Sequence, residues 1–278
     1  MKCSLLQFKY FSFLLTVFIS ISINYDFIAQ SSTNLNINDG LPSNTVRCFH
    51  RSNDGIMWIG TDAGLCSYDG RDFKVYDQTD GLASNQIYSI VEDNFNNLWI
   101  GCYNGGISYY NGSDFKSFTV ENGLPTKKVK KLFFKDQLLF ISSEDKLVIF
   151  DGNKFYYKDF IMQVMSVVET ENSINVISQA TGLYELSYNK DSLENFSLDS
   201  CGWFGSLYGG VNYNNGLLLF KNNELNYIRK DSNANKFVNK VIKTNSLTNA
   251  ASVVNDSITY LAQGDITLNN GGVFRLHR

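Results

Sequence analysis

The stretch GLPSNTVRCFHRSNDGIMWIGTDAGLCSYDG, residues 40–70, is the unit that the rest of this chain repeats. It returns as GLASNQIYSIVEDNFNNLWIGCYNGGISYYNG at residues 81–112, and more faintly as GLPTKKVKKLFFKDQLLFISSEDKLVIFDG at residues 123–152. The starts of the copies, at Leu41, Leu82 and Leu124, are 41 and 42 residues apart. A repeat of about 40 residues that contains several short strands is typical of a β-propeller blade.

Each repeat contains the pattern of four short strands. In the first copy, residues 46–50 alternate apolar and polar side chains, and residues 56–59 form an apolar run, with the turn-forming Asp54-Gly55 between them. Residues 65–68 and 73–76 supply two more candidate strands, each preceded by a Gly-containing turn. The sequence therefore predicts an all-β fold, a propeller of four-stranded antiparallel blades.

Aromatic side chains recur at fixed places in the repeats. A blade cannot bury both of its faces alone, so the recurring aromatic residues are expected to form the core between blades. One slot holds Trp58, Trp99 and Phe140, a second holds Tyr68, Tyr110 and Phe150, and a third holds Phe73, Phe115 and Phe155.

These motifs resemble the two-component regulator propeller repeat. The resemblance is carried by Gly40-Leu41-Pro42-Ser43-Asn44, Trp58-Ile59-Gly60-Thr61 and Tyr68-Asp69-Gly70, with close counterparts in the second copy. It covers roughly residues 34–158 and is weak after that. The family builds the extracytoplasmic sensor regions of bacterial hybrid histidine kinases, so the resemblance implies a sensor module; the kinase modules are absent from this chain.

The later part of the chain keeps the approximate spacing of strands and turns seen in the repeats, but not their sequence motifs. Five glycines, and Lys146 in the third copy, stand where a third strand is expected to begin. Together they indicate six blades, and the drift in their spacing also fits five or seven. The glycines are Gly64, Gly106, Gly182, Gly216 and Gly272. Residues 34–37 precede Gly40 as a fourth strand precedes the later Gly-Leu pairs. We expect this N-terminal strand to pair into the last blade and close the propeller, because unpaired sheet edges are a liability.

Residues 1–30 have the layout of a secretory signal peptide. Lys2 and Lys9 precede an apolar run over residues 11–23, and Ala29 offers a small residue for cleavage. The alternative, a retained membrane anchor, requires about 18 or more apolar residues, whereas Ser12, Ser20 and other polar residues interrupt this run. The predicted domains are thus a signal peptide, residues 1–30, and a propeller, residues 31–278, exported to the periplasm or the extracellular space with no membrane span after cleavage.

Charge and cysteine usage exclude several functions. Cleavage would leave the chain one unit more negative than its whole-chain net charge of −3, which gives no electrostatic footprint for nucleic acid. The one basic run, residues 127–131, is interpreted as a solvated strand edge. The cysteines left after cleavage match no zinc pattern, so no metal site is predicted; they are Cys48, Cys66, Cys102 and Cys201.

No catalytic constellation is visible in the sequence. His50 and His277 are the only histidines, and neither lies in a nucleophile motif. No phosphate loop or dinucleotide fingerprint occurs, so we expect no cofactor and no enzymatic activity.

Ligand candidates come from slots that differ between repeats. The turn between the second and third strands carries Asp62, Tyr103 and Glu144 in one such slot, with Asn104 beside Tyr103. Tyr103 with Asn104 offers a stacking face beside an amide, and the aromatic ring of Tyr103 beside the carboxylate of Asp62 suits a sugar-like or amphipathic ligand better than a purely anionic one. The alternative, that these residues are solvated turns, stays open. Repeated slots such as Asn44 and Asn85 are expected to form turns instead.

The sequence leaves three classes of function. The first is a non-catalytic sensing module that binds a small molecule, a glycan or a protein partner in signalling. The second is a structural or protein-interaction scaffold. The third, a propeller-type lyase or glycosidase, is the least favoured because it requires convergent carboxylates or a metal-binding histidine in the funnel.

Overall fold

In a computed structural model the described residues are 35–171, 173–202, 206–213, 216–221, 224–230, 237–243, 248–254, 258–264 and 271–277, those after Ile228 as backbone strands. The chain divides after residue 35 into two units, of which the second, residues 36–278, is compact. All the strands belong to the second unit. They form six antiparallel sheets, five of four strands and a last one of three.

The first three sheets correspond to the three recognisable repeats. The first contains β1 (Val46–Arg51), β2 (Met57–Thr61), β3 (Gly64–Tyr68) and β4 (Phe73–Tyr76). The second contains β5 (Ile87–Glu92), β6 (Leu98–Cys102), β7 (Gly106–Tyr110) and β8 (Phe115–Phe118). The third contains β9 (Val129–Lys135), β10 (Leu138–Ser143), β11 (Lys146–Phe150) and β12 (Phe155–Asp159).

The other three sheets come from the part of the chain in which the sequence motifs of the repeat are no longer recognisable. The fourth contains β13 (Val164–Glu169), β14 (Ile174–Ser178), β15 (Gly182–Ser187) and β16 (Ser197–Gly202). The fifth contains β17 (Leu207–Tyr213), β18 (Gly216–Lys221), β19 (Glu224–Lys230) and β20 (Phe237–Lys243). The sixth contains β21 (Thr248–Val254), β22 (Ile258–Gly264) and β23 (Gly271–His277).

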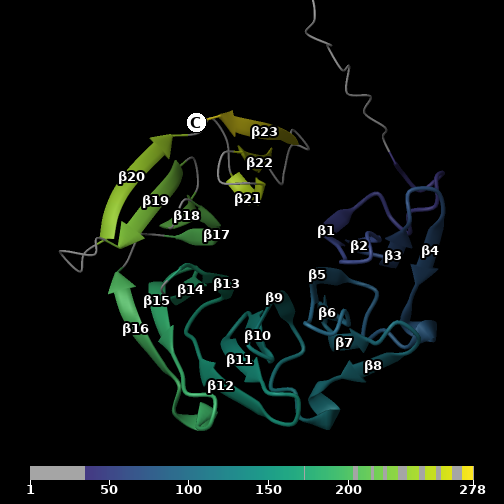
Figure 1. Cartoon of the computed structure of the whole chain (residues 1–278), viewed down its shortest axis with the longest axis horizontal. Helices are drawn as coiled ribbons and strands as arrows, with labels where there is room; N and C mark the ends of the chain where they lie inside the picture. The colour runs from purple at the N-terminus through teal and green to yellow at the C-terminus, as the bar shows by residue number, and fades with distance from the viewer. Residues whose placement is uncertain are drawn as a thin grey trace, which may run out of the picture. The chain divides into compact units, whose positions relative to one another are not determined.

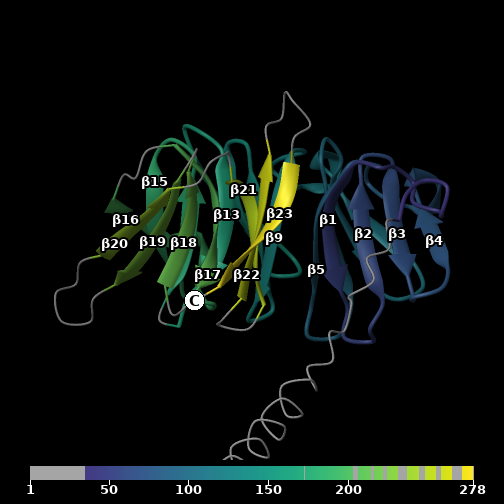
Figure 2. The ribbon, with the colours of Figure 1, turned by 90° about the horizontal axis from the view of Figure 1, so that it is seen from above.

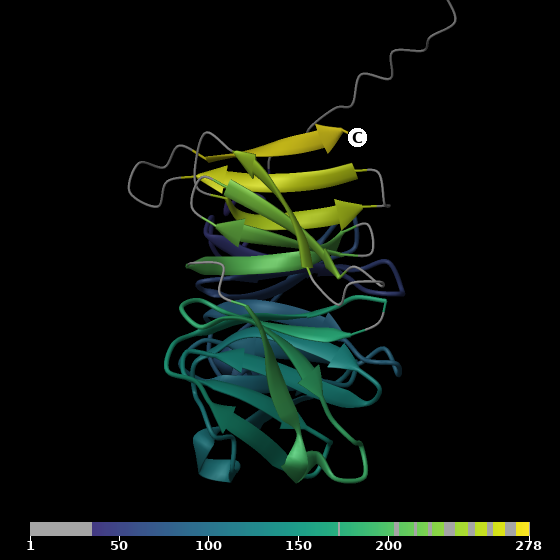
Figure 3. The ribbon, with the colours of Figure 1, turned by 90° about the vertical axis from the view of Figure 1, so that its left-hand side faces the viewer.

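The sheets are arranged as the blades of a propeller (Figure 1). In each, the first strand lies innermost, and the innermost strands of consecutive sheets contact one another from β1 through β5, β9, β13 and β17 to β21. From the side, the strands run between two faces formed by the turns (Figure 2). In Figure 3 some of the green strands run obliquely to the yellow strands of the sixth sheet. The prediction of an all-β propeller with six blades is confirmed.

The predicted closing strand is wrong for the residues that the structure describes. Ile37–Gly40 form a turn, and the sixth sheet has three strands, none of them from residues 35–37. The physical reason is a side-chain cap: Asp39 accepts a hydrogen bond from the backbone N–H of Asn36, and Asn44 accepts one from the N–H of Ile37. Asn34, the first residue of the predicted strand, lies outside the described residues.

The same cap precedes the second sheet, which shows why the motif repeats. Asp77 caps a short 3₁₀ turn, η1 (Gln78–Asp80), and Gly81 ends it at a φ of 110°. Asn85 accepts from the N–H of Gln78, as Asn44 does from Ile37. The assignment of Asn44 and Asn85 as turn formers is therefore confirmed. Two further 3₁₀ turns are η2 (Val120–Asn122) and η3 (Leu193–Asn195).

One assignment in the later chain is off by a strand. Gly216 begins β18, the second strand of the fifth sheet, rather than a third strand. Both strands are short apolar runs that follow a glycine or a turn, so the run Gly216–Phe220 does not distinguish them by composition. The pairing does: Gly216 lies opposite Tyr213 of β17, the innermost strand.

The repeated aromatic slots form the contacts between neighbouring sheets. Of the six residues in the first two slots, Trp58, Trp99, Phe140, Tyr110 and Phe150 are buried, and Tyr68 is half-buried and stacks on Phe73. The ring of Trp58 lies 5.5 Å from that of Tyr110 in the next sheet, and the Trp99 and Phe150 rings are 5.8 Å apart. Between the third and fourth sheets, the ring of Phe140 lies 5.6 Å from that of Tyr188.

The glycine of the Trp-Ile-Gly motif allows the next sheet to approach. A Cβ atom on Gly60 would lie 2.6 Å from both the Cys48 sulfur and the Ile87 Cγ2 atom. Gly101 occupies the same place in the second sheet, where a Cβ atom would lie 2.9 Å from Val129. The motif thus allows the innermost strand of the next sheet to lie close to the second strand of the sheet before it, β5 to β2 and β9 to β6.

Candidate functional site

Every innermost strand carries a bulge at the same position near one end. In β1, Val46 pairs with Thr61 and Cys48 pairs with Gly60, so Arg47 has no partner in the ladder. A bulge bends the strand and redirects a side chain, and bulges are frequent beside functional sites. The six unpaired residues are Arg47, Tyr88, Lys130, Met165, Tyr208 and Asn249.

The bulges lie beside the turns that carry the predicted site. Asp62, Tyr103 and Glu144 directly follow β2, β6 and β10, whose last residues pair with the residue before each bulge. Two slots that vary between repeats therefore meet at one face of the propeller. We call this face, defined by Arg47, Tyr88 and Lys130 with Asp62, Tyr103 and Glu144, the bulge face.

In the first sheet, the two variable slots form an ion pair. The Arg47 Nε and Nη2 atoms donate to the two carboxylate oxygens of Asp62, both at 2.7 Å. Such a bidentate geometry is the strongest form of an arginine–carboxylate pair. The Asp62 carboxylate, predicted as a ligand-binding group, therefore already has a cationic partner.

Aromatic rings connect the first sheet to the second. The guanidinium carbon of Arg47 lies 5.3 Å from the ring centroid of Tyr88, within the range of a cation–π contact. Tyr88 in turn stacks on Tyr103 of its own sheet, with centroids 4.8 Å apart and an interplanar angle of 18°. One face of the Tyr103 ring is thus covered by protein.

The chain of contacts continues into the third sheet. The Tyr103 hydroxyl donates to Glu144 Oε1 at 2.6 Å, and the Lys128 ammonium donates to Glu144 Oε2 at 2.5 Å. Two hydrogen bonds lower the pKa of the Glu144 carboxyl: the one from Lys128 has the larger effect, and the one from Tyr103 the smaller. The bond to the carboxylate raises the pKa of Tyr103.

Lys130, the bulge residue of the third sheet, extends the network to the fourth. Its ammonium donates to the Gln163 side-chain oxygen at 2.9 Å and lies 4.0 Å from Glu144. Partial burial lowers the pKa of Lys130. The bulge face therefore carries a continuous set of polar and aromatic contacts across four consecutive sheets.

The four predicted site residues are brought together in part. Tyr103 and Glu144 are in direct contact, whereas Asp62 reaches Tyr103 through Arg47 and Tyr88. Asn104 is exposed and has a φ of 62°, in the left-handed region that asparagine tolerates at turns. Its amide is available at the surface, beside the network rather than within it.

The bulge residues were missed by sequence reasoning. Arg47, Tyr88 and Lys130 stand at one position of the repeat and differ in every copy, which is the signal used to select Asp62, Tyr103 and Glu144. The sequence predicts ordinary strand residues at this position, because no glycine or proline marks the bulge. Applying the same variability criterion to the strands would have found them.

Other features of the described residues bear on chemistry. His50 lies 3.2 Å from Glu92. In the part of the chain that the structure describes, no group of three or more His, Cys, Asp or Glu side chains is placed to hold a metal ion. Over the same residues, no helix has the length and apolar character needed to cross a membrane.

Sheet number, topology and the arrangement of contacts define the chain as a β-propeller. The family described as two component regulator propeller matches residues 40–63 and 81–104, which confirms the resemblance for the first two repeats. No curated protein matches the chain in sequence.

Several solved structures share the fold. The extracellular domain assigned to the hybrid two component system BT3049 from B. thetaiotaomicron superposes with a TM-score of 0.68 and 19% identity, over 88% of this chain and 35% of that one. The corresponding domain of BT4673 gives 0.66 and 18%, over 85% and 34%. This chain therefore spans about a third of the length of those two.

Virginiamycin B lyase from Staphylococcus aureus also superposes, with a TM-score of 0.63 and 10% identity over 84% of each chain. At sequence identities this low, the superpositions show a common fold and nothing more. The same propeller architecture therefore occurs in an enzyme and in extracellular domains of two-component systems, and function has to be argued from the site.

Proposed function

We propose that the chain is an exported, non-catalytic β-propeller that recognises a ligand at its bulge face, as a sensor module of the two-component regulator type. One observation carries the proposal: at this face the variable slots of consecutive sheets meet and touch, whereas the repeated aromatic slot of Trp58, Trp99 and Phe140 is buried between sheets. Packing requires the same residues in each blade, and recognition requires different ones.

The geometry refines the class of ligand. Asp62 and Glu144 already pair with Arg47 and Lys128, so a cationic ligand would have to displace a lysine or an arginine. The half-buried Tyr88–Tyr103 pair and the exposed Asn104 amide offer apolar edges beside hydrogen-bonding groups. This combination suits a sugar-like or amphipathic ligand.

Export is part of the proposal. Residues 1–30 would act as a cleaved signal peptide, and residues 31–278 would form the mature propeller in the periplasm or outside the cell. The test is to determine the N-terminal sequence and the mass of the protein recovered from the cytoplasmic, periplasmic and extracellular fractions. A mature N-terminus near Ser31 is expected, and an intact Met1 on an exported protein would contradict cleavage.

A thermal-shift screen of oligosaccharides and metabolites tests recognition at the bulge face. A ligand present at 100 times its Kd should stabilise the full chain by about 2.7 kcal/mol. Tyr103→Ala and Asp62→Ala should remove most of that shift. A ligand whose shift survives both substitutions would place recognition elsewhere, and a broad screen without any hit would favour the scaffold function.

The screen has a matched control in Asp69→Asn. Asp69 follows β3, outside the bulge-face network, and accepts hydrogen bonds from the backbone N–H groups of Arg71 and Asp72. Asn111 makes the equivalent bonds in the second sheet, so asparagine fits the position. This variant removes one negative charge without touching the bulge face and should keep the full ligand shift.

A further inference from the structure

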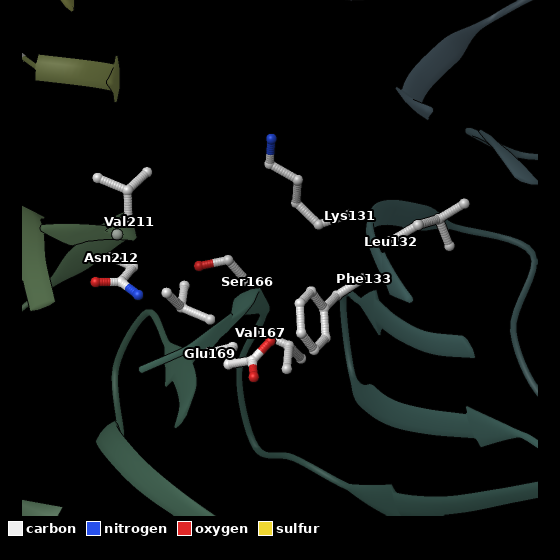
Figure 4. A pocket seen from close by; sticks show the side chains of 10 residues that line it. Lys131, Leu132, Phe133, Ser166, Val167, Glu169, Val211 and Asn212 are labelled. Carbon is white, nitrogen blue, oxygen red and sulfur yellow. The ribbon is translucent and has the colours of Figure 1, made fainter. Parts of the chain in front are cut away.

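A pocket of about 310 Å³ opens on the inner side of the propeller, between the innermost strands of the third, fourth and fifth sheets (Figure 4). Its walls come from β9, β13 and β17. Small-molecule sites have volumes of about 300–1,000 Å³, so this pocket is large enough for a compact ligand. None of the four predicted site residues lines it.

The pocket carries one uncompensated positive charge. Lys131 is exposed at its edge, and its ammonium makes no hydrogen bond or ion pair with any side chain that the structure describes. Figure 4 shows it extended away from the other labelled side chains. The one acidic residue of the lining, Glu169, is paired with Lys135.

A hydroxyl without a partner lies in the same lining. Ser166 is 5% exposed, and its Oγ atom has no hydrogen-bond partner among the described residues. A buried hydroxyl that loses its bonds to water without replacing them is unfavourable, and such groups are uncommon in native structures. The Oγ atom is itself enclosed, so an oxygen atom of a ligand in the pocket would supply the missing partner after the Ser166 side chain turns toward the cavity.

The remaining walls are mostly apolar. Phe133, Val167 and Val211 present hydrocarbon surface, and Gly210 contributes only backbone. Glycine is needed at this position because a Cβ atom would lie 2.7 Å from Ile177. An unpaired cation and a hydroxyl beside apolar walls are complementary to a molecule with one anionic end and an apolar body.

We infer that this pocket binds a small organic carboxylate, with the carboxylate at Lys131 and Ser166 and the apolar body against Phe133, Val167 and Val211. The inference rests on the proposed recognition role and assigns it a second site. The negative net charge of the whole chain does not oppose it, because exposed charges beyond about 8 Å are largely screened at physiological salt. The charge that a ligand meets in the pocket is therefore mainly that of the unpaired Lys131.

The test uses the full chain with two probes of nearly equal shape, benzoate and the uncharged benzamide. Binding is measured by isothermal titration and by saturation-transfer NMR. Benzoate should bind and benzamide should bind at least tenfold more weakly, because a hydrogen-bonded charge is lost. Lys131→Gln should weaken benzoate binding by about tenfold or more without changing the melting temperature of the free protein.

The matched control is Lys127→Gln, which removes an exposed lysine of the same basic run outside the pocket lining. It should leave benzoate binding unchanged. Ser166→Ala should affect stability and binding in opposite directions. The free protein should be as stable as wild type or more stable, because an unpartnered hydroxyl is removed, while benzoate binding should weaken.

Three results would overturn the assignment: no detectable benzoate binding, equal binding of benzoate and benzamide, or equal effects of Lys131→Gln and Lys127→Gln. These outcomes are separable from failure of the proposed function. A ligand shift that depends on Tyr103 would still support recognition at the bulge face after the carboxylate pocket had been disproved, because the two sites share no residue.

Discussion

The Tyr103 hydroxyl donates a 2.6 Å hydrogen bond to the Glu144 carboxylate, although the two residues hold the same turn position in consecutive sheets. Equivalent positions in neighbouring blades thus touch each other at the bulge face. This contact joins the second sheet to the third, as the Arg47–Tyr88 contact joins the first to the second. The variable slots therefore have a structural role between blades in addition to the recognition proposed for them.

Glu144→Gln should reduce the dependence of stability on pH. The folded-state pKa of Glu144 is lowered, chiefly by Lys128, so its contribution is present above the unfolded-state pKa of about 4.3 and is lost as pH falls through the folded value. The carboxylate is partly solvated, so this contribution is at most about 1 kcal/mol. Urea unfolding at pH 7 and pH 3 should show wild type losing its advantage over the variant on acidification. An equal difference at both pH values would contradict the assignment.

Trp99→Ala should destabilise the protein by roughly 3–5 kcal/mol, because the ring leaves a cavity between two sheets. Trp99 is 8% exposed, and it contacts Phe118 of its own sheet and Phe150 of the next one. Phe95→Ala is the control, since Phe95 is 73% exposed and should change stability by no more than about 0.5 kcal/mol. Equal urea midpoints for the two variants would show that Trp99 does not hold the sheets together.

Gly60→Ala should destabilise the protein by about 1–3 kcal/mol through overpacking. The new methyl group would meet Cys48 and Ile87 at 2.6 Å. Ile87→Ala removes the contact with the Cγ2 atom, whereas the Cys48 sulfur and the Cβ atom of residue 87 stay close, so the double variant should lose less stability than the two single changes together. Strict additivity in urea unfolding would show that Gly60 is not required for the approach of β5.

The fold could be predicted because its main determinants repeat. Trp58, Trp99 and Phe140 occupy one slot since each must fill the space beside the next sheet, and Asn44 and Asn85 recur since each caps the same turn. Where repetition ends, the assignment becomes less certain. Gly216 was placed on the wrong strand because an apolar run alone does not state its position in a sheet.

The site was predicted only in part, for a different reason. Variation between repeats selects the turn slot, but Arg47, Tyr88 and Lys130 belong to a bulge that depends on the register of two strands. The pairing of Tyr103 with Glu144 depends further on the angle between sheets. The cluster around Lys131 and Ser166 requires three sheets to be placed together, and the basic run alone suggested only a solvated strand edge.

The last prediction concerns the contact between Arg47 and Tyr88, which links the first two sheets at the bulge face. A double-mutant cycle with Arg47→Ala and Tyr88→Ala, measured by urea unfolding, should give a coupling free energy of about 0.5–1 kcal/mol, the value of an exposed cation–π contact. Arg51 lies at the other end of β1 and supplies the control cycle, Arg51→Ala with Tyr88→Ala, which should be additive within about 0.3–0.5 kcal/mol. Equal coupling in both cycles would mean that the effect of Arg47 is general electrostatics rather than a contact between blades.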